Sequence, residues 1–83
     1  MKSNDIAVLR MRAIVEADAC VLIRVLQHLQ MRNIVPSRVR AQRLGSDFID
    51  IEVEVSGLAS DVFKNLVAKI NQMPLVVTAV ACD

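Results

Sequence analysis

The sequence has few residues of the kinds that stack on bases or hold phosphates. It contains no tryptophan or tyrosine, two phenylalanines and two glycines. Single-stranded nucleic acid is bound largely by stacking bases on aromatic side chains, which are nearly absent here. A phosphate-binding loop needs several glycines close together, whereas Gly45 and Gly57 are far apart. We therefore expect no nucleic-acid partner and no nucleotide cofactor.

Cysteine and histidine are equally scarce. Cys20 and Cys82 are too few for a disulfide framework and lack the close spacing of metal ligands, so we expect reduced thiols in a cytoplasmic protein. His28 is the single histidine and falls within an expected helix, near no obvious nucleophile. Cys20 at a helix start leaves open a reactive thiol. The sequence predicts no metal, no cofactor and no catalytic residue, and hence a protein that is not an enzyme.

Long apolar runs are also missing. A helix that spans a bilayer needs about 18 or more apolar residues, and the N-terminal stretch MKSNDIAVLRMR is too polar for a secretory signal. We expect no membrane partner and one domain over residues 1–83. The chain is nevertheless 54% hydrophobic. A domain of this size buries only roughly 60% of its extended surface, so the apolar excess favours a partner surface.

Alternation of apolar and charged residues predicts two strands. In residues 6–15, Leu9, Met11 and Ala13 fall on one face, and Arg10 and Arg12 fall on the other. In residues 48–55, FIDIEVEV, the alternation is strict. The expected inward residues there are Ile49, Ile51, Val53 and Val55, and the expected outward residues are Asp50, Glu52 and Glu54. A period of two over such lengths is typical of a strand with one solvated face.

Helical spacing predicts two helices. Asp18 is a candidate N-cap for a helix that runs to about Arg32, and a second helix covers about residues 59–72. The expected buried residues of the first helix are Val21, Leu22, Val25, Leu26 and Leu29, with Ile23 off the stripe. Those of the second helix are Val62, Phe63, Leu66, Val67 and Ile70.

Two further strands follow prolines, at residues 37–44 after Pro36 and at residues 76–82 after Pro74. The order βαββαβ, with right-handed crossovers and a hairpin around residues 45–47, predicts an α+β, ferredoxin-like fold. In this fold a four-stranded antiparallel sheet carries both helices on one face. Strands one and three lie at the centre, so that both prolines precede edge strands, where a missing N–H group is tolerated.

Charge is unevenly distributed along the chain. Residues 1–45 hold eight basic and three acidic side chains, and residues 46–83 hold two basic and six acidic ones. Pairing strands two and three around Gly45 sets Arg38 opposite Glu54 and Arg40 opposite Glu52, with Val39 opposite Val53 on the buried face. Arg10 and Arg12 lie on the neighbouring central strand. We therefore interpret the arginines as cross-strand partners of the carboxylates.

The segments IVEADACVLIRVLQHLQMRNIVPSRVRA, FIDIEVEV and LVAKINQMPLVVTAVAC resemble an ACT domain across nearly the whole chain. Within that class the sequence is most similar to the short regulatory subunit of acetolactate synthase. Arg24-Val25-Leu26, Arg32 and the stretch KINQMPLVV carry this similarity. The resemblance implies an ACT-like homodimer. It also implies a protein partner, the large catalytic subunit, which depends on thiamine diphosphate and is activated by the small one.

The stretch VEADACVLIRVL holds the turn where, as the resemblance implies, many ACT domains bind an amino acid. The positions that match this site are Ala17, Asp18, Ala19, Cys20, Val21 and Val35. Amino-acid-binding members have asparagine, glycine and asparagine where this chain has Ala17, Cys20 and Val35. Because a buried zwitterion without hydrogen-bond partners is costly, we expect no valine inhibition. The alternative is that another ligand, such as a different amino acid, still binds at this turn and is accommodated by Cys20.

Two other functions stay open at this point. The chain could be a free-standing ACT dimer that senses an amino acid or another small metabolite, or a domain of a longer regulated enzyme. The first would be favoured by a melting temperature that one amino acid raises. Met1 and the short polar lead after it weigh against the second.

Overall fold

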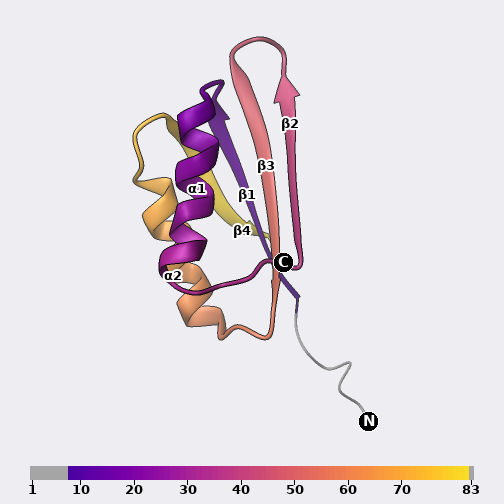
Figure 1. The fold of residues 1–83 in the computed structure, drawn as a ribbon, viewed down its shortest axis with the longest axis vertical. Coiled ribbons are helices and arrows are strands. Elements are labelled where there is room, and N and C mark those ends of the chain that lie inside the picture. The colour runs from indigo at the N-terminus through magenta and orange to yellow at the C-terminus, as the bar shows by residue number, and fades with distance from the viewer. Residues whose placement is uncertain (1–7, 83) are drawn as a thin grey trace.

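The computed structural model describes residues 8–82, which form one antiparallel sheet and two helices (Figure 1). The elements in chain order are β1 (Val8–Glu16), α1 (Ala19–Met31), β2 (Arg38–Leu44), β3 (Phe48–Ser56), α2 (Ser60–Asn71) and β4 (Val76–Cys82). The predicted βαββαβ order and ferredoxin-like fold class are confirmed. Residues 6 and 7 of the first predicted strand lie outside the described residues.

The strands lie in the order β2-β3-β1-β4, so the prediction that strands one and three are central is correct. The register between β2 and β3 sets Arg38 opposite Glu54, Val39 opposite Val53 and Arg40 opposite Glu52, as predicted. The pairing of β1 with β4 is irregular. A bulge between Ile14 and Val15 shifts the register near the start of β4.

The core lies between the sheet and the two helices, which cover the same face in Figure 1. Val21, Val25 and Leu29 of α1 and Phe63, Leu66, Val67 and Ile70 of α2 are buried. The core strands contribute Met11, Ala13, Val15, Ile51, Val53, Val55 and Ala79. Both helices therefore bury an apolar stripe, and the inward rows of β1 and β3 pack against it.

Three residues predicted on buried faces are exposed. Val39 is 40% exposed, Val62 of α2 is 40% exposed and Leu26 of α1 is 37% exposed. Val39 does share a face with Val53, but the helices do not extend over β2. The sequence period identified the correct face, and the position of the helices over that face decided what is buried. No helix within residues 8–82 is long and apolar enough to cross a bilayer.

Candidate functional site

The β1–α1 turn is organised around the side chain of Asp18. Asp18 has extended backbone angles, and its Oδ1 accepts a hydrogen bond of 2.7 Å from the Cys20 N–H group. The predicted N-cap is confirmed. The N–H group of Val21 donates to the Asp18 carbonyl at 3.2 Å, and the Val21 side chain is 2% exposed. Val21 is thus a core residue rather than part of an open surface.

Two further hydrogen bonds fix this turn to its neighbours. The Ala17 N–H group donates to the Asp47 carbonyl at 2.9 Å, and the Glu16 N–H group donates to the Leu75 carbonyl at 2.8 Å. The N–H groups of Ala17, Cys20 and Val21 therefore already have acceptors within the chain. A ligand carboxylate that approached this turn would have to displace one of them.

The turn borders an open depression of about 500 Å³. Its lining consists of Glu16, Ala17, Asp18, Ser46, Asp47, Phe48 and Leu75. Three of these residues carry carboxylates, and none carries a positive charge. The depression therefore suits an ammonium group better than the carboxylate of an amino acid.

Val35, the remaining predicted site residue, lies at the other end of α1. The helix ends with Asn33 in the left-handed conformation (φ 54°), where Asn33 and Ile34 donate to the carbonyls of Gln30 and Leu29. This C-terminal motif turns the chain towards β2 and leaves Val35 83% exposed. Thirteen helical residues span about 20 Å. Within one chain, the structure brings residues 17–21 together and leaves Val35 remote from them.

Cys20 and His28 do not form a catalytic pair. The Cys20 thiol is exposed at the N-terminus of α1, and His28 lies two turns further along the same helix. Arg32 Nη1 donates a hydrogen bond of 2.9 Å to the His28 carbonyl and lies 3.3 Å from Nδ1 of the His28 ring. Partial burial, followed by the charges of Arg32 and Lys69, lowers the pKa of His28. In residues 8–82, no cluster of three or more acidic, histidine or cysteine residues is arranged to hold a metal ion.

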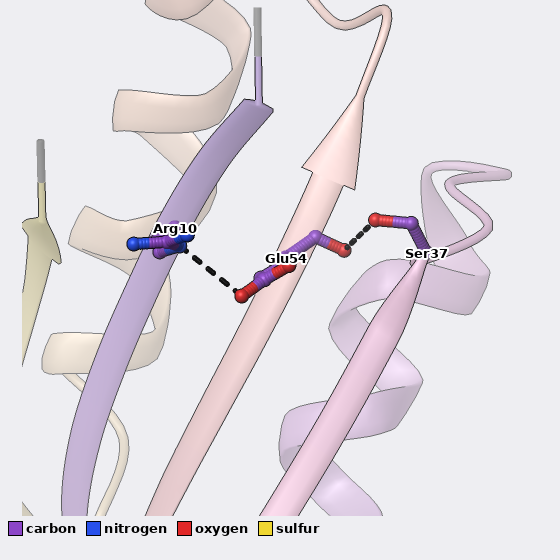
Figure 2. A network of polar contacts seen from close by, with 3 residues as sticks. All are labelled: Arg10, Ser37 and Glu54. Atoms are coloured by element: carbon purple, nitrogen blue, oxygen red, sulfur yellow. Dashed lines mark hydrogen bonds and ion pairs between the residues drawn. The ribbon is translucent and has the colours of Figure 1, made fainter.

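The face of the sheet away from the helices carries ordered ion pairs between β1 and β3. Arg10 Nε contacts Glu54 Oε2 at 3.1 Å, and the Glu54 carbonyl accepts from the Ser37 hydroxyl, also at 3.1 Å (Figure 2). Arg12 donates two hydrogen bonds, of 2.9 and 2.8 Å, to Asp50. The hydrogen bonds from Arg12 lower the pKa of the Asp50 carboxyl.

The predicted proximity of the β1 arginines to these carboxylates is confirmed, but the proposed partners on β2 need correction. Arg38 and Arg40 lie opposite Glu54 and Glu52 in register. Neither arginine makes an ion pair with a carboxylate of residues 8–82. Glu54 and Asp50 instead pair with arginines on β1. Each carboxylate of β3 has an arginine-bearing strand on both sides, so the register alone could not predict which arginine it contacts.

The main surface that sequence reasoning missed is β2 itself, all seven residues of which are exposed. Arg43 lies opposite Ile49, on the same face as Val39 and Ala41, and its Nη2 donates to the Ser46 carbonyl at 3.0 Å. A charged residue at an inward position was a signal in the sequence that the core does not extend beneath this strand.

No protein-family model and no curated protein matches this sequence. Solved structures do resemble it. The crystal structure of the ACT domain from the GTP pyrophosphokinase of Chlorobium tepidum is 9% identical, with a TM-score of 0.79 over 93% of this chain and 99% of that one. The solution structure of the same domain has a TM-score of 0.78 at 9% identity, over 94% of this chain and 88% of that one.

A third similar structure is the C-terminal domain of the MgtC protein from Mycobacterium tuberculosis. It is 17% identical, with a TM-score of 0.75 over 99% of this chain and 92% of that one. The chain therefore has an ACT-like fold. At these identities the likeness concerns the fold alone.

Proposed function

We propose that this chain is a cytoplasmic, non-catalytic regulatory subunit that binds and activates the large catalytic subunit of acetolactate synthase in branched-chain amino-acid biosynthesis. Two lines of support meet here. The ACT-like fold extends over nearly the whole chain, and the sequence resembles the short regulatory subunit of that enzyme in the first helix, in β3 and before β4. The thiamine diphosphate on which catalysis depends would belong to the large subunit.

The observation that carries the proposal is the amount of apolar surface that the fold leaves uncovered. Ile23 of α1 is 56% exposed, Met31 is 69% exposed and Val35 is 83% exposed. A small domain rarely exposes several large apolar side chains on neighbouring elements unless another surface covers them. A protein partner that buries them is the role expected of a regulatory subunit.

The geometry of the β1–α1 turn supports the absence of valine feedback inhibition. The N–H groups that could bind a carboxylate are used within the chain, Asp18 places a negative charge beside them, and Ala17 offers no polar side chain. Valine would therefore lose its hydration without recovering hydrogen bonds. We expect its binding to be weaker than about 1 mM.

A homodimer belongs to the same proposal. β2 pairs with β3 on one side only, so its other side presents N–H and C=O groups without strand partners. In addition, Val35 is too far from Ala17 to share a ligand within one chain. An amino-acid site built from both would need a second copy.

Reconstitution with purified catalytic subunit from the same source tests the proposal. Acetolactate formation is measured while the full chain is added, with and without valine. We expect activity to rise to a plateau near stoichiometric addition and valine to leave that plateau unchanged. The test variant is Ile23→Asp, which changes an exposed residue and preserves the core. It should fold normally and require a higher concentration for the same activation. No binding and no activation by the unaltered chain would overturn the proposal.

A free-standing ACT dimer that senses an amino acid is the second candidate. The depression lined by Glu16, Asp18 and Asp47 favours it, because three carboxylates could hold an ammonium group. A thermal-shift screen of the amino acids, each at about 5 mM, tests this function. A rise in melting temperature with one amino acid that Asp47→Asn abolishes would support the sensor. No rise with any amino acid would count against it.

A further inference from the structure

The face of the sheet away from the helices (Figure 1) holds a charged hollow over β1, β2 and β3. In register, Arg38, Glu54 and Arg10 form one row across these strands, and Arg40, Glu52 and Arg12 form the next. An open cavity of about 330 Å³, bordered by all six residues, lies over the two rows. We call it the outer hollow. Four arginines against two carboxylates leave an excess of two positive charges, which favours an anionic ligand.

Only part of this charge is paired within residues 8–82. Arg10 Nε contacts Glu54 Oε2 at 3.1 Å (Figure 2). Arg12 reaches past its own row and donates its two hydrogen bonds to Asp50. Glu52 therefore makes no ion pair within the described part of the chain, although an arginine lies opposite it on each side. One carboxylate of the outer hollow is thus left for a ligand.

The two arginines of β2 that face the outer hollow, Arg38 and Arg40, are the cations left for a ligand. Neither guanidinium donates a hydrogen bond to an acceptor within residues 8–82, whereas Arg43, on the helix side of β2, donates to the Ser46 carbonyl. Because they are two residues apart on one strand, their Cα atoms lie about 6.6 Å from each other. The planar donors of a guanidinium match the oxygens of phosphate and carboxylate groups. Two long side chains at this spacing can hold one oxyanion between them.

Arg40 is also close to the carboxylates of β3. A smaller hollow of about 120 Å³ is bordered by Arg40 and Glu52 as well. Hydrogen bonds from Arg12 lower the pKa of Asp50 most, and the charges of Arg12 and Arg40 lower it further. A ligand held by Arg40 would therefore lie within reach of Glu52.

Glu52 restricts which anions suit the outer hollow. An ionised carboxylate accepts hydrogen bonds and has no hydrogen to donate. An anion whose oxygens are all acceptors, such as sulfate, would be repelled by Glu52. An anion that also carries an O–H group, such as hydrogen phosphate or a hydroxycarboxylate, can donate that hydrogen to Glu52 while its other oxygens accept from the arginines.

We propose that the outer hollow binds a small oxyanion that also carries an O–H group, held by Arg38 and Arg40 and selected by Glu52. The site is separate from the β1–α1 turn and depends neither on a catalytic subunit nor on a homodimer. It lies on the opposite side of the sheet from α1, so a protein partner that covers Ile23 leaves it open.

Nuclear magnetic resonance titration of the full chain, in buffer of low ionic strength without phosphate, tests the site with two matched pairs of anions. The pairs are hydrogen phosphate with sulfate and malate with succinate; within each pair, the first member has the additional O–H group. We expect a dissociation constant below about 1 mM for phosphate or malate, about fivefold or more below that of its matched anion. The Nε–H signals of Arg38 and Arg40 should shift, and that of Arg43 should not. The pair that shows the preference identifies the ligand as inorganic or carboxylic.

Three variants assign the roles of the residues. Replacing both Arg38→Gln and Arg40→Gln should weaken binding by about tenfold or more. Arg43→Gln removes the same kind of charge from the helix side of the same strand and is the matched control, with a change below about twofold expected. Glu52→Gln supplies an amide N–H donor, so sulfate and succinate should bind about fivefold more tightly and the preference should disappear.

Three results would overturn the inference. The first is the absence of saturable shifts with any of the four anions up to about 20 mM. The second is an equal loss of binding in the Arg43→Gln variant, which would indicate a general charge effect. The third is an unchanged preference for the O–H group in the Glu52→Gln variant, which would remove Glu52 from the site.

Discussion

The two edges of the sheet have opposite relations to the core. β4 lies beneath α2, and its Ala79 is 6% exposed. The Ala79 N–H group also donates to Asn71 Oδ1 at 2.8 Å, which ties the strand to the end of that helix. β2 has neither cover nor a helix contact of this kind, and all its residues are exposed.

One row of side chains across the sheet shows what the difference means. Ala41, Ile51, Ala13 and Ala79 lie side by side on the helix face, from one edge to the other. Ile51 and Ala13 are fully buried, Ala79 is nearly so, and Ala41 is exposed. Alanine therefore occupies both ends of this row, exposed on β2 and buried on β4. The helices, and not the amino acid, decide which edge belongs to the core.

The largest expected effect comes from placing the same charge at both ends of that row. Ala79→Asp buries a carboxylate beneath α2, and we expect it to lower the free energy of unfolding by more than about 3 kcal/mol. Ala41→Asp leaves the carboxylate in water, and it should lower the free energy of unfolding of the monomer by only about 0.5–1 kcal/mol. Urea denaturation at low protein concentration measures both values.

The homodimer proposed above would separate the two variants in the opposite sense. If two copies pair through β2, a variant that carries Ala41→Asp should be well folded but dimerise less readily than the unaltered chain, because it places a carboxylate on the helix side of that strand in each copy. Equal loss of folding stability in both variants would contradict the difference between the edges. Dimerisation unaffected by Ala41→Asp would contradict a contact at β2.

A smaller effect is expected from the polar contacts that hold each edge. Asn71→Ala removes the acceptor of the Ala79 N–H group and should destabilise the chain by about 1–2 kcal/mol. Asn71→Asp retains an acceptor and is the matched control. Ser37→Ala removes a hydroxyl group, just before the first residue of β2, that donates to the Glu54 carbonyl of β3. Its cost should stay below about 0.5 kcal/mol, since water replaces that bond. Urea midpoints of the three variants provide the comparison.

The electrostatic character of the β2 contact can be changed with little effect on the monomer. Two copies that paired through β2 would bring Arg38, Arg40 and Arg43 of both chains together, and Gln42→Glu would add a carboxylate beside them. Cross-strand pairs of opposite charge contribute roughly 0.2–1 kcal/mol each, so two such pairs should lower the dissociation constant of this dimer by about two- to thirtyfold at low salt. Gln42→Arg should raise it. Sedimentation equilibrium measures both, and a change of the same sign in both variants would contradict a contact at β2.

The smallest expected effect concerns the ion pair of Asp50, a carboxylate of β3 that lies between the arginine-bearing strands β1 and β2. Asp50 pairs with Arg12 of β1 rather than with β2, and hydrogen bonds from Arg12 lower its pKa in the folded state. The unfolded chain therefore binds a proton more readily at acidic pH. The stability that the pair provides is complete above about pH 4 and is lost as the pH falls through the lowered folded-state pKa.

Asp50→Asn should remove this pH-dependent step. The difference in urea midpoint between the unaltered chain and the variant should be greatest at neutral pH and vanish in acid. Glu52→Gln lies on the same strand face and has no ion pair within residues 8–82, so it serves as the control. An equal pH step lost in both variants would mean that the field of the whole face, and not the pair with Arg12, sets this dependence.

Sequence patterns predicted the elements and their order well, because each rests on local physics. The alternation in β3, the N-cap at Asp18 and the prolines before both edge strands each restrict the backbone nearby. The register of β2 against β3 followed from the short turn. Leu26 and Val39 were assigned to buried faces because a period identifies a face and carries no information on how far the helices extend over it.

The candidate site was predictable only as a set of positions. Ala17, Asp18 and Cys20 do lie together in one turn, since they are neighbours in sequence. That the N–H group of Ala17 is used by Asp47 depends on how the β2–β3 turn meets the β1–α1 turn, which no local pattern encodes. Val35 is separated from them by the length of α1. These residues could contact one ligand only if Val35 came from a second copy of the chain.

The bulge between Ile14 and Val15 would limit the size of any assembly that this chain forms through its sheet. A sheet whose two edges were both regular could add copies at either end and grow into a filament. In the homodimer proposed above, pairing through β2 would leave the two β4 strands at the outer margins, each displaced in register by the bulge. Irregular pairing of this kind resists further addition. Growth should therefore stop at two chains, so that raising the concentration saturates the dimer and does not lead to polymer.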